Sequence, residues 1–172
     1  MEIVKYYLLL WEGFMDIYEE KLQELFEQFK VATKFVVATS KENRVTARTM
    51  SCICVDGAIY FQTDSRFLKY NQLLANPQVA LCINNIQIEG IASILGKPLD
   101  AKNLFFAKLF EQYYKSSFDS YTALETEVLI QVDPTRITVW EYEEDMPIRI
   151  IFDLVNKEYL KEPYLYKERN SI

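Results

Sequence analysis

The turns between the first strand-forming segments are too short to allow a parallel sheet in this part of the chain. Three β-rich runs follow one another at 35–39, 44–55 and 58–63. The polar turn 40–43 separates the first two runs, and Asp56-Gly57 alone separates the last two. An Asp-Gly pair is typical of a two-residue hairpin turn. Parallel neighbours need a crossover of about a dozen residues or more, so we expect an antiparallel meander.

Helical and β-rich patterns alternate along the rest of the chain. Apolar residues recur at three-to-four spacing over 16–31, 65–75 and 101–115, and this spacing predicts amphipathic helices. The further predicted strands are 78–84, 86–95, 128–132, 136–142 and, as the last regular run, 149–155. A charged, tyrosine-rich tail follows.

This order of elements predicts a mainly β (α+β) fold, built as a closed or partly closed antiparallel barrel. Helices interrupt the series of short strands after the third and after the fifth strand, and they would act as lids over the barrel. A parallel doubly wound sheet fits less well, because its helices would alternate regularly with its strands.

A length of 172 residues and a hydrophobic fraction of 50% suit one globular domain with its own core. We expect this domain to span 15–172, because a clean helix pattern opens at Met15, and we expect 1–14 to be an N-terminal extension. The apolar run 6–11 is too short to cross a bilayer, and it lacks a small-residue cleavage site. We therefore expect no association with a membrane.

Composition excludes several classes of function. The formal net charge of −6 argues against non-specific binding to nucleic acids or to an anionic membrane surface. The chain has no histidine, which excludes Ser-His and Cys-His nucleophilic pairs, histidine-bound zinc or iron, and a proximal-histidine haem.

The cysteines Cys52, Cys54 and Cys82 are an odd number without a long-range pattern, which predicts reduced thiols in a cytoplasmic protein. If their segment is a strand, Cys52 and Cys54 point to the same face, and paired cysteines can bind metal. Without a second pair they make a poor zinc site. We therefore expect no metal and interpret all three as small packing residues.

One charged residue lies in the interior of the predicted strand 44–55. Strand alternation puts Arg48 on the same largely apolar face as Met50 and two of the cysteines. A guanidinium in such surroundings needs an anionic partner. That partner is either a carboxylate, such as Glu89, in a salt bridge, or the phosphate of a bound ligand, whose oxygens match the guanidinium fork.

A second cation follows at the point where a strand ends and a helix begins. The strand ends at Thr63, Ser65 can cap the next helix, and Lys69 sits one turn inside that helix on the same side. Hydroxyls, a lysine and the free N–H groups of a helix N-terminus together suit a phosphate. Taken alone, the segment favours an ordinary capped surface helix.

Amide side chains alternate with isoleucines from Asn85 to Glu89. The isoleucines are expected to face the core, while Asn85 and Gln87 face the opposite surface. Amides offer both donors and acceptors, so this row suits either the edge of a heteroaromatic ring or a solvated sheet face.

Short motifs at 37–40, 47–50, 56–61, 73–81 and 88–90 follow one another with Thr63 and Lys69 between them. In this order and spacing, the stretch from about 34 to 97 resembles the pyridoxamine 5'-phosphate oxidase-like superfamily of FMN-binding split barrels. The segment 133–140, which ends in Trp140, looks like the family's later strand.

The resemblance implies an antiparallel split β-barrel that binds FMN in a cleft between the two subunits of a homodimer. It implies cofactor contacts by Arg48, Lys69 and Thr63 at the phosphate, by Thr49, Met50 and Gln62 along the isoalloxazine ring, and by Asn85 and Trp140 elsewhere on the flavin.

Two departures from the family pattern bear on the substrate. Phe67 and Leu68 stand where pyridoxamine 5'-phosphate oxidases proper have a serine and an arginine, and the family's C-terminal arginine–histidine motif is absent. The resemblance therefore predicts FMN but not a vitamin B6 substrate.

The leading hypothesis is an FMN-dependent oxidoreductase that acts on a small molecule, with no side chain singled out as catalytic. The alternatives are a flavin- or haem-binding carrier or sensor without turnover, a deazaflavin-dependent reductase, and a structural protein with an empty cleft.

Overall fold

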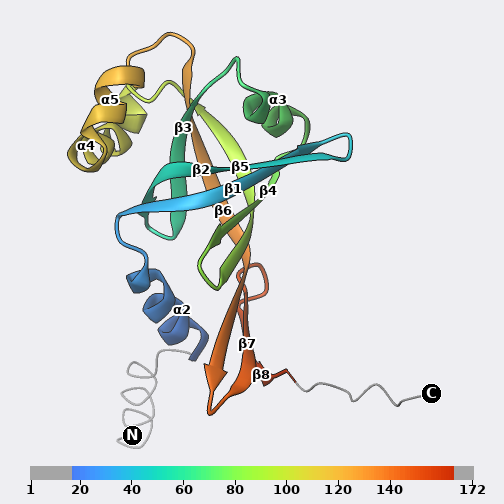
Figure 1. Ribbon diagram of the computed structural model, residues 1–172. Coiled ribbons are helices and arrows are strands. Elements are labelled where there is room, and N and C mark those ends of the chain that lie inside the picture. Colours follow the sequence, from blue (N-terminus) through green and yellow to red (C-terminus); the bar gives the residue numbers. More distant parts are fainter. Residues whose placement is uncertain (1–16, 165–172) are drawn as a thin grey trace, which may run out of the picture.

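In the computed structural model, which describes residues 17–164, six strands close into an antiparallel barrel and two more extend from it (Figure 1). The strand order is β3-β2-β1-β4-β5-β6, and pairing of β3 with β6 closes the barrel. The strands are β1 (Ala32–Lys41), β2 (Arg44–Val55), β3 (Ala58–Asp64), β4 (Gln78–Ile83), β5 (Ile86–Gly96), β6 (Glu127–Glu143), β7 (Met146–Asp153) and β8 (Glu158–Pro163). This architecture confirms the predicted mainly β barrel.

The helices lie outside the barrel wall (Figure 1). They are α2 (Ile17–Gln28), α3 (Leu68–Ala75), the 3-10 turn η1 (Ala101–Asn103), α4 (Leu104–Tyr113) and α5 (Lys115–Tyr121). α3 packs on β1, and α4 packs on α5 and on the strands β1 and β2. No described helix is long and apolar enough to cross a membrane.

The predicted meander is confirmed, and its turns explain why it forms. Asp56 and Gly57 both have positive φ, of 50° and 78°, between β2 and β3. Glu42 and Asn43, with φ of 49° and 63°, make the same kind of turn between β1 and β2. Two consecutive residues with positive φ match the twist of the strands that they join, so each turn directs an antiparallel return.

Alternation along the strands builds two apolar clusters. Side chains such as Phe35, Phe61 and Ile88 fill the barrel interior and are fully buried. Outside the barrel, Phe106 and Phe110 of α4 stack with their ring centroids 5.0 Å apart and cover Ile53 and Leu129. The second cluster fixes α4 against the wall of the barrel, which matters because Phe110 also faces the cavity described below.

The two strands predicted at 128–132 and 136–142 are one continuous strand, β6. One edge of β6 pairs with β3 up to Val132 and with β7 from Arg136 onward, while β5 pairs along its other edge. Pro134 sits between these two partners, where its missing N–H breaks no ladder to β3 or β7. Proline is tolerated in a strand at such a position, so Asp133-Pro134 does not end the strand.

The regions after residue 100 also differ from the sequence-based prediction. The helix expected at 101–115 divides at Tyr114, and α5 was not predicted because it is polar and buries none of its residues. Strand β8 was not predicted either, since its residues are charged and mostly exposed. The proposed extension 1–14 lies outside the described residues.

Candidate functional site: a cavity around Lys69

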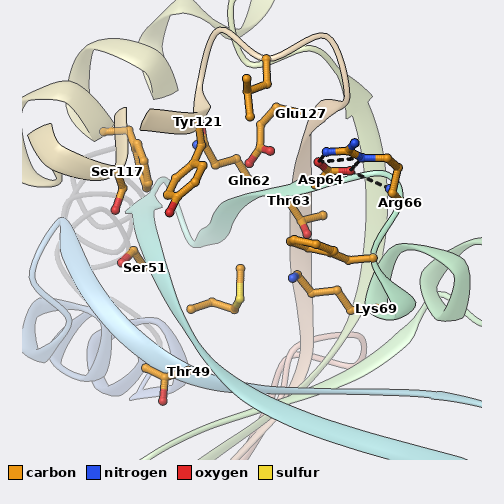
Figure 2. Close-up of a pocket in the computed structure, with 14 residues that line it drawn as sticks. Thr49, Ser51, Gln62, Thr63, Asp64, Arg66, Lys69, Ser117, Tyr121 and Glu127 are labelled. Atoms are coloured by element: carbon orange, nitrogen blue, oxygen red, sulfur yellow. Dashed lines mark hydrogen bonds and ion pairs between the residues drawn. The ribbon is translucent and has the colours of Figure 1, made fainter. Parts of the chain in front are cut away.

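A cavity of about 370 Å³ opens beside the barrel where β2, β3, α3, α4, α5 and the start of β6 meet (Figure 2). We call it the Lys69 cavity. Its lining residues are Thr49, Met50, Ser51, Gln62, Thr63, Asp64, Arg66, Phe67, Lys69, Phe110, Ser117, Tyr121, Leu124 and Glu127. The structure therefore gathers five of the eight predicted cofactor residues in one cavity: Thr49, Met50, Gln62, Thr63 and Lys69.

Thr63 holds an unused hydroxyl at the wall of this cavity. The residue is only 2% exposed, and its Oγ1 is the single buried side-chain polar atom without a hydrogen-bond partner among residues 17–164. Burying a hydroxyl without a partner is unfavourable by about 1–3 kcal/mol. A ligand oxygen in the cavity would remove that penalty.

Lys69 points into the cavity without a carboxylate partner. Its Nζ lies 4.5 Å from the centroid of the Phe67 ring, and no described carboxylate lies within ion-pair distance. Burial lowers the pKa of Lys69, and the positive charge of Arg48 lowers it further. The half-buried ammonium is therefore short of negative charge, as expected of an anion-binding group.

Arg48 does not line the cavity, but its charge acts on Lys69. Its Nη1 donates to Val37 O at 3.1 Å and to Thr39 Oγ1 at 2.8 Å, and its Nη2 donates to Thr46 Oγ1. These bonds leave the Nε–H and one Nη2–H without a partner in the described part of the chain. Burial lowers the pKa of the Arg48 guanidinium.

The alternative that Arg48 forms a salt bridge with Glu89 is wrong. Glu89 is exposed and accepts a hydrogen bond from Gln87 Nε2 at 3.1 Å. Within residues 17–164, no carboxylate lies close enough to Arg48 to form an ion pair. Neutral acceptors, one backbone carbonyl and two threonine hydroxyls, hold the guanidinium instead.

The predicted helix cap at Ser65 is also wrong, because α3 begins later. Phe67 is the N-cap residue and offers no capping side chain. Asp64 organises the turn instead. Its carboxylate accepts from the Arg66 backbone N–H at 2.8 Å, from Arg66 Nη2 at 2.6 Å and from Thr126 Oγ1 at 2.8 Å. Arg66 is thereby neutralised and is not available as a third free cation.

Sequence reasoning missed Glu127, a carboxyl group of the cavity. Glu127 is 4% exposed and lies directly opposite Asp64 in the β3–β6 ladder. Burial and the Asp64 charge raise the pKa of Glu127 to about 7, and Lys69 opposes that rise. Unlike Asp64, it accepts no side-chain hydrogen bond from the described residues, so near neutral pH it carries only part of a charge.

Gln62 connects the cavity to the segment after α5. Its Oε1 accepts a hydrogen bond from Thr122 Oγ1 at 3.0 Å, and both side chains are buried. This contact holds the chain that carries Tyr121 over the cavity, where Figure 2 shows the Tyr121 side chain beside Gln62. The α5 wall, with Ser117, Tyr121 and Leu124, was not predicted because α5 itself was not.

Comparison with known proteins assigns this architecture to a family. A family model described as pyridoxamine 5'-phosphate oxidase matches residues 18–141, which include β1 to β5, most of β6 and the Lys69 cavity. The chain belongs to the pyridoxamine 5'-phosphate oxidase-like family. Among curated proteins, none matches this sequence.

Solved structures of this fold include proteins with different ligands. An FMN-binding protein from Nostoc punctiforme, related to pyridoxamine 5'-phosphate oxidase, is 14% identical with a TM-score of 0.58, covering 88% of this chain and 98% of its own. PhzG from Burkholderia lata, in complex with tetrahydrophenazine-1-carboxylic acid, is 13% identical with a TM-score of 0.57, covering 85% and 88%. The haem storage protein HutZ from Vibrio cholerae is 14% identical with a TM-score of 0.58, covering 71% and 94%. At these identities the likeness shows the fold alone.

The last two predicted cofactor residues of this family member lie outside the cavity. Asn85 Nδ2 donates to the Trp140 carbonyl oxygen at 2.6 Å, so the turn between β4 and β5 is tied to β6. The Trp140 ring packs edge-on against Tyr164 with centroids 5.5 Å apart, and it is 38% exposed. Asn85 and Trp140 thus lie together, but not with the other predicted site residues.

The structure supports a packing role for two of the three cysteines. Cys52 is buried in the barrel core and Cys54 is half-buried beside it. Burial raises the pKa of both thiols, that of Cys54 to about 12, so neither is a thiolate at neutral pH. Cys82 is exposed on β4, so the prediction that it is a packing residue is wrong.

Proposed function

We propose that this protein binds FMN in the Lys69 cavity and uses it as an oxidoreductase that acts on a small molecule. The observation that carries the proposal is the buried Thr63 hydroxyl without a partner, beside the unpaired ammonium of Lys69. Both residues line one cavity, and a hydroxyl and an ammonium both suit the oxygens of a phosphate. Arg48, with no carboxylate partner, adds a second positive charge nearby.

The three groups have separate tasks at the phosphate. Lys69 Nζ and the Thr63 hydroxyl donate hydrogen bonds to phosphate oxygens. Arg48 supplies charge and the two N–H groups that its threonine and carbonyl contacts leave unused. The net charge of the cavity favours an anion, because Arg66 neutralises Asp64 and Glu127 is only partly ionised near neutral pH, while Lys69 is positively charged.

Thr49, Met50 and Gln62 would lie along the isoalloxazine ring. Met50 offers an apolar, polarizable surface, and the Gln62 amide can donate from the nitrogen that Thr122 does not use. When bound, FMN supplies hydride and electron transfer, while these residues hold the ring and keep water from one of its faces. The α5 wall, with Ser117 and Tyr121, would then contact the substrate.

The complete site requires a second copy of the chain. Asn85 and Trp140 lie apart from the cavity, so they can serve the flavin only as groups of the partner in a homodimer. The exposed Trp140 ring is an apolar surface of the kind that such an interface would cover. The free thiols support a cytoplasmic location for this dimer.

Haem binding without turnover is the second candidate, because HutZ shares the fold. Haem propionates are anions and could use the same cations. The chain has no histidine, however, so an axial ligand would have to come from a residue such as Met50 or Tyr121. The donor set therefore fits a phosphate better than an iron centre.

Reconstitution distinguishes these functions. Purified protein is incubated with FMN, a deazaflavin or haemin, desalted, and measured by visible absorbance. We expect retention of FMN and bleaching of its absorbance by NADH or NADPH. Retention of FMN whose absorbance neither NADH nor NADPH bleaches would indicate a carrier. Retention of haemin and not of FMN would overturn the proposal.

A further inference from the structure

Gln72 is the most completely buried polar side chain near the cavity. It lies on α3 with no exposed surface, next to the buried Leu73. A buried amide is unfavourable unless its donors and acceptors are bonded. Its Nε2 donates to the Arg44 carbonyl oxygen at 2.9 Å, and its Oε1 accepts two hydroxyl hydrogen bonds.

These two hydroxyls belong to Thr39 of β1 and Thr46 of β2. Thr39 Oγ1 lies 2.6 Å and Thr46 Oγ1 lies 2.8 Å from Gln72 Oε1. A carbonyl oxygen can only accept, so each threonine must donate its single hydrogen to Gln72. The lone pairs of both hydroxyls are therefore free to accept from another donor.

That donor is Arg48. Its Nη1 donates to Thr39 Oγ1 at 2.8 Å, and its Nη2 donates to Thr46 Oγ1. Gln72 thus determines the direction of both hydroxyls, and the hydroxyls in turn hold the two ends of the guanidinium. Without the Gln72 carbonyl, the hydroxyls could rotate, and each could offer Arg48 a hydrogen in place of a lone pair.

The same amide attaches α3 to the barrel. α3 has eight residues and no side-chain cap, so it depends on tertiary contacts for its position. Gln72 binds it to β1 and β2 one turn after Lys69, the other cation of the site. One side chain therefore controls how the two cations face each other.

We propose that Gln72 is a positioning residue that orients Arg48, through Thr39 and Thr46, toward the anion bound beside Lys69. The inference rests on the proposed function, because it assumes that this anion is the FMN phosphate. Nothing in it requires Gln72 to touch the cofactor.

The test compares FMN with riboflavin, which lacks the phosphate. In Gln72→Met the side chain keeps its length but loses both hydrogen-bonding groups. We expect the affinity for FMN to fall about tenfold while the affinity for riboflavin stays unchanged. Asn103→Leu is the matched control. Asn103, the N-cap residue of α4, is an equally buried amide, and its Nδ2 donates to the backbone carbonyl oxygens of Leu95 and Lys97. This replacement should lower stability without changing the ratio of the two affinities.

A double-mutant cycle shows whether Gln72 acts through Arg48. In an Arg48→Ala background, Gln72→Met should change the FMN-to-riboflavin ratio by much less than tenfold. If Gln72→Met does not fold, Thr46→Val tests the same connection, because it removes one of the two oriented hydroxyls. The same tenfold loss of FMN affinity is expected.

The outcomes separate this inference from the proposed function. Equal affinities for FMN and riboflavin in the wild-type protein would overturn the proposed phosphate site and this inference with it. A wild-type preference for FMN that persists unchanged in Gln72→Met or Thr46→Val would overturn the inference alone. If Gln72→Met changes the FMN-to-riboflavin affinity ratio by the same factor in the Arg48→Ala background as in the wild-type protein, the claim that Gln72 acts through Arg48 is overturned.

Discussion

At the residue scale, Lys69 lies in surroundings that disfavour its positive charge. Burial and Arg48 both lower its pKa, the charges of Glu127 and Asp64 only partly oppose this, and its Nζ lies over the Phe67 ring. An ordinary structural lysine would face solvent or pair with a carboxylate. A bound anion would supply the negative charge that Lys69 lacks in the unliganded protein. Lys69 is therefore the most informative residue to replace.

Lys69→Ala should weaken FMN binding by roughly tenfold to a hundredfold, because a charge-assisted hydrogen bond is worth about 1.5–3 kcal/mol. The fluorescence of FMN, measured during titration with protein, gives the dissociation constant. Lys108→Ala is the matched control, since Lys108 is an exposed lysine of α4 that lines no part of the cavity. Equal effects of the two replacements would contradict the assignment of Lys69.

Glu127 makes the stability of the unliganded protein depend on pH. Its pKa is raised to about 7 in the folded state from 4.5, so the folded state holds this proton more tightly than the unfolded state. The wild-type protein should therefore lose stability as pH rises from about 4.5 to 7, by at most about 3 kcal/mol.

Urea unfolding at pH 5 and at pH 8 measures this effect. Glu127→Gln should remove most of the difference and be the more stable form at pH 8. Glu125→Gln, at a largely exposed position two residues earlier, should keep the wild-type profile. A pH profile that is the same for Glu127→Gln and wild type would show that Glu127 is not the group responsible.

The chemistry of single residues was only partly predictable. Local sequence indicated Thr63 and Lys69, because a strand end and a helix start are visible in the residue pattern. The partners of Arg48 were not predictable, since two of its acceptors come from the neighbouring strand β1. Glu127 gave no signal either, because only the β3–β6 pairing brings it opposite Asp64.

At the scale of elements, the β5–β6 pairing depends on Gly90. The register shifts between Glu89 and Gly90, and a Cβ on Gly90 would lie 2.7 Å from Val132 Cγ1 and 2.8 Å from the Asp133 carbonyl oxygen. The second of these atoms is backbone and cannot move away without distorting β6. A glycine is therefore required where β6 passes from β3 to β7.

Gly90→Ala should destabilise the protein by about 1–3 kcal/mol through this overpacking. Chemical denaturation followed by tryptophan fluorescence measures the change. Ser93→Ala serves as control, because Ser93 is exposed on the same strand and its replacement should shift stability by less than about 0.5 kcal/mol. Similar losses of stability in both variants would show that β6 moves to accommodate the added methyl group, and that a glycine is not required at position 90.

Among the elements, those marked by turn residues were the most predictable. Asp56-Gly57 and the polar turn 40–43 defined the first three strands, because positive φ at two adjacent positions permits few other conformations. The continuity of β6 could not be predicted, because a proline within a β-rich run usually marks the end of a strand. Pro134 is tolerated only because it lies between the part of β6 that pairs with β3 and the part that pairs with β7. β8 and α5 were hidden because neither has a clear apolar face.

At the scale of the whole molecule, the position of Asn85 and Trp140 bears on the assembly. Both were expected at the flavin, yet they lie together outside the Lys69 cavity. A homodimer reconciles these facts if each subunit contributes Lys69 to one site and Trp140 to the other. Light scattering should accordingly give a mass near twice 20.3 kDa at micromolar concentration.

Mixing two variants tests the shared site more sharply. Lys69→Ala and Trp140→Ala should each bind FMN weakly as homodimers. After subunit exchange, about a quarter of the sites should combine an intact Lys69 with an intact Trp140 and regain wild-type affinity. A mass of 20.3 kDa, or no recovery after confirmed exchange, would contradict a site built from two subunits.

The central claim is that the Lys69 cavity recognises a phosphate group, and calorimetric titration of the wild-type protein with FMN and with riboflavin tests it most directly. Contacts from Lys69 and Arg48, each worth about 1.5–3 kcal/mol, predict that FMN binds at least a hundredfold more tightly than riboflavin. The preference should shrink as salt screens the charges. Equal dissociation constants for the two flavins would contradict the account.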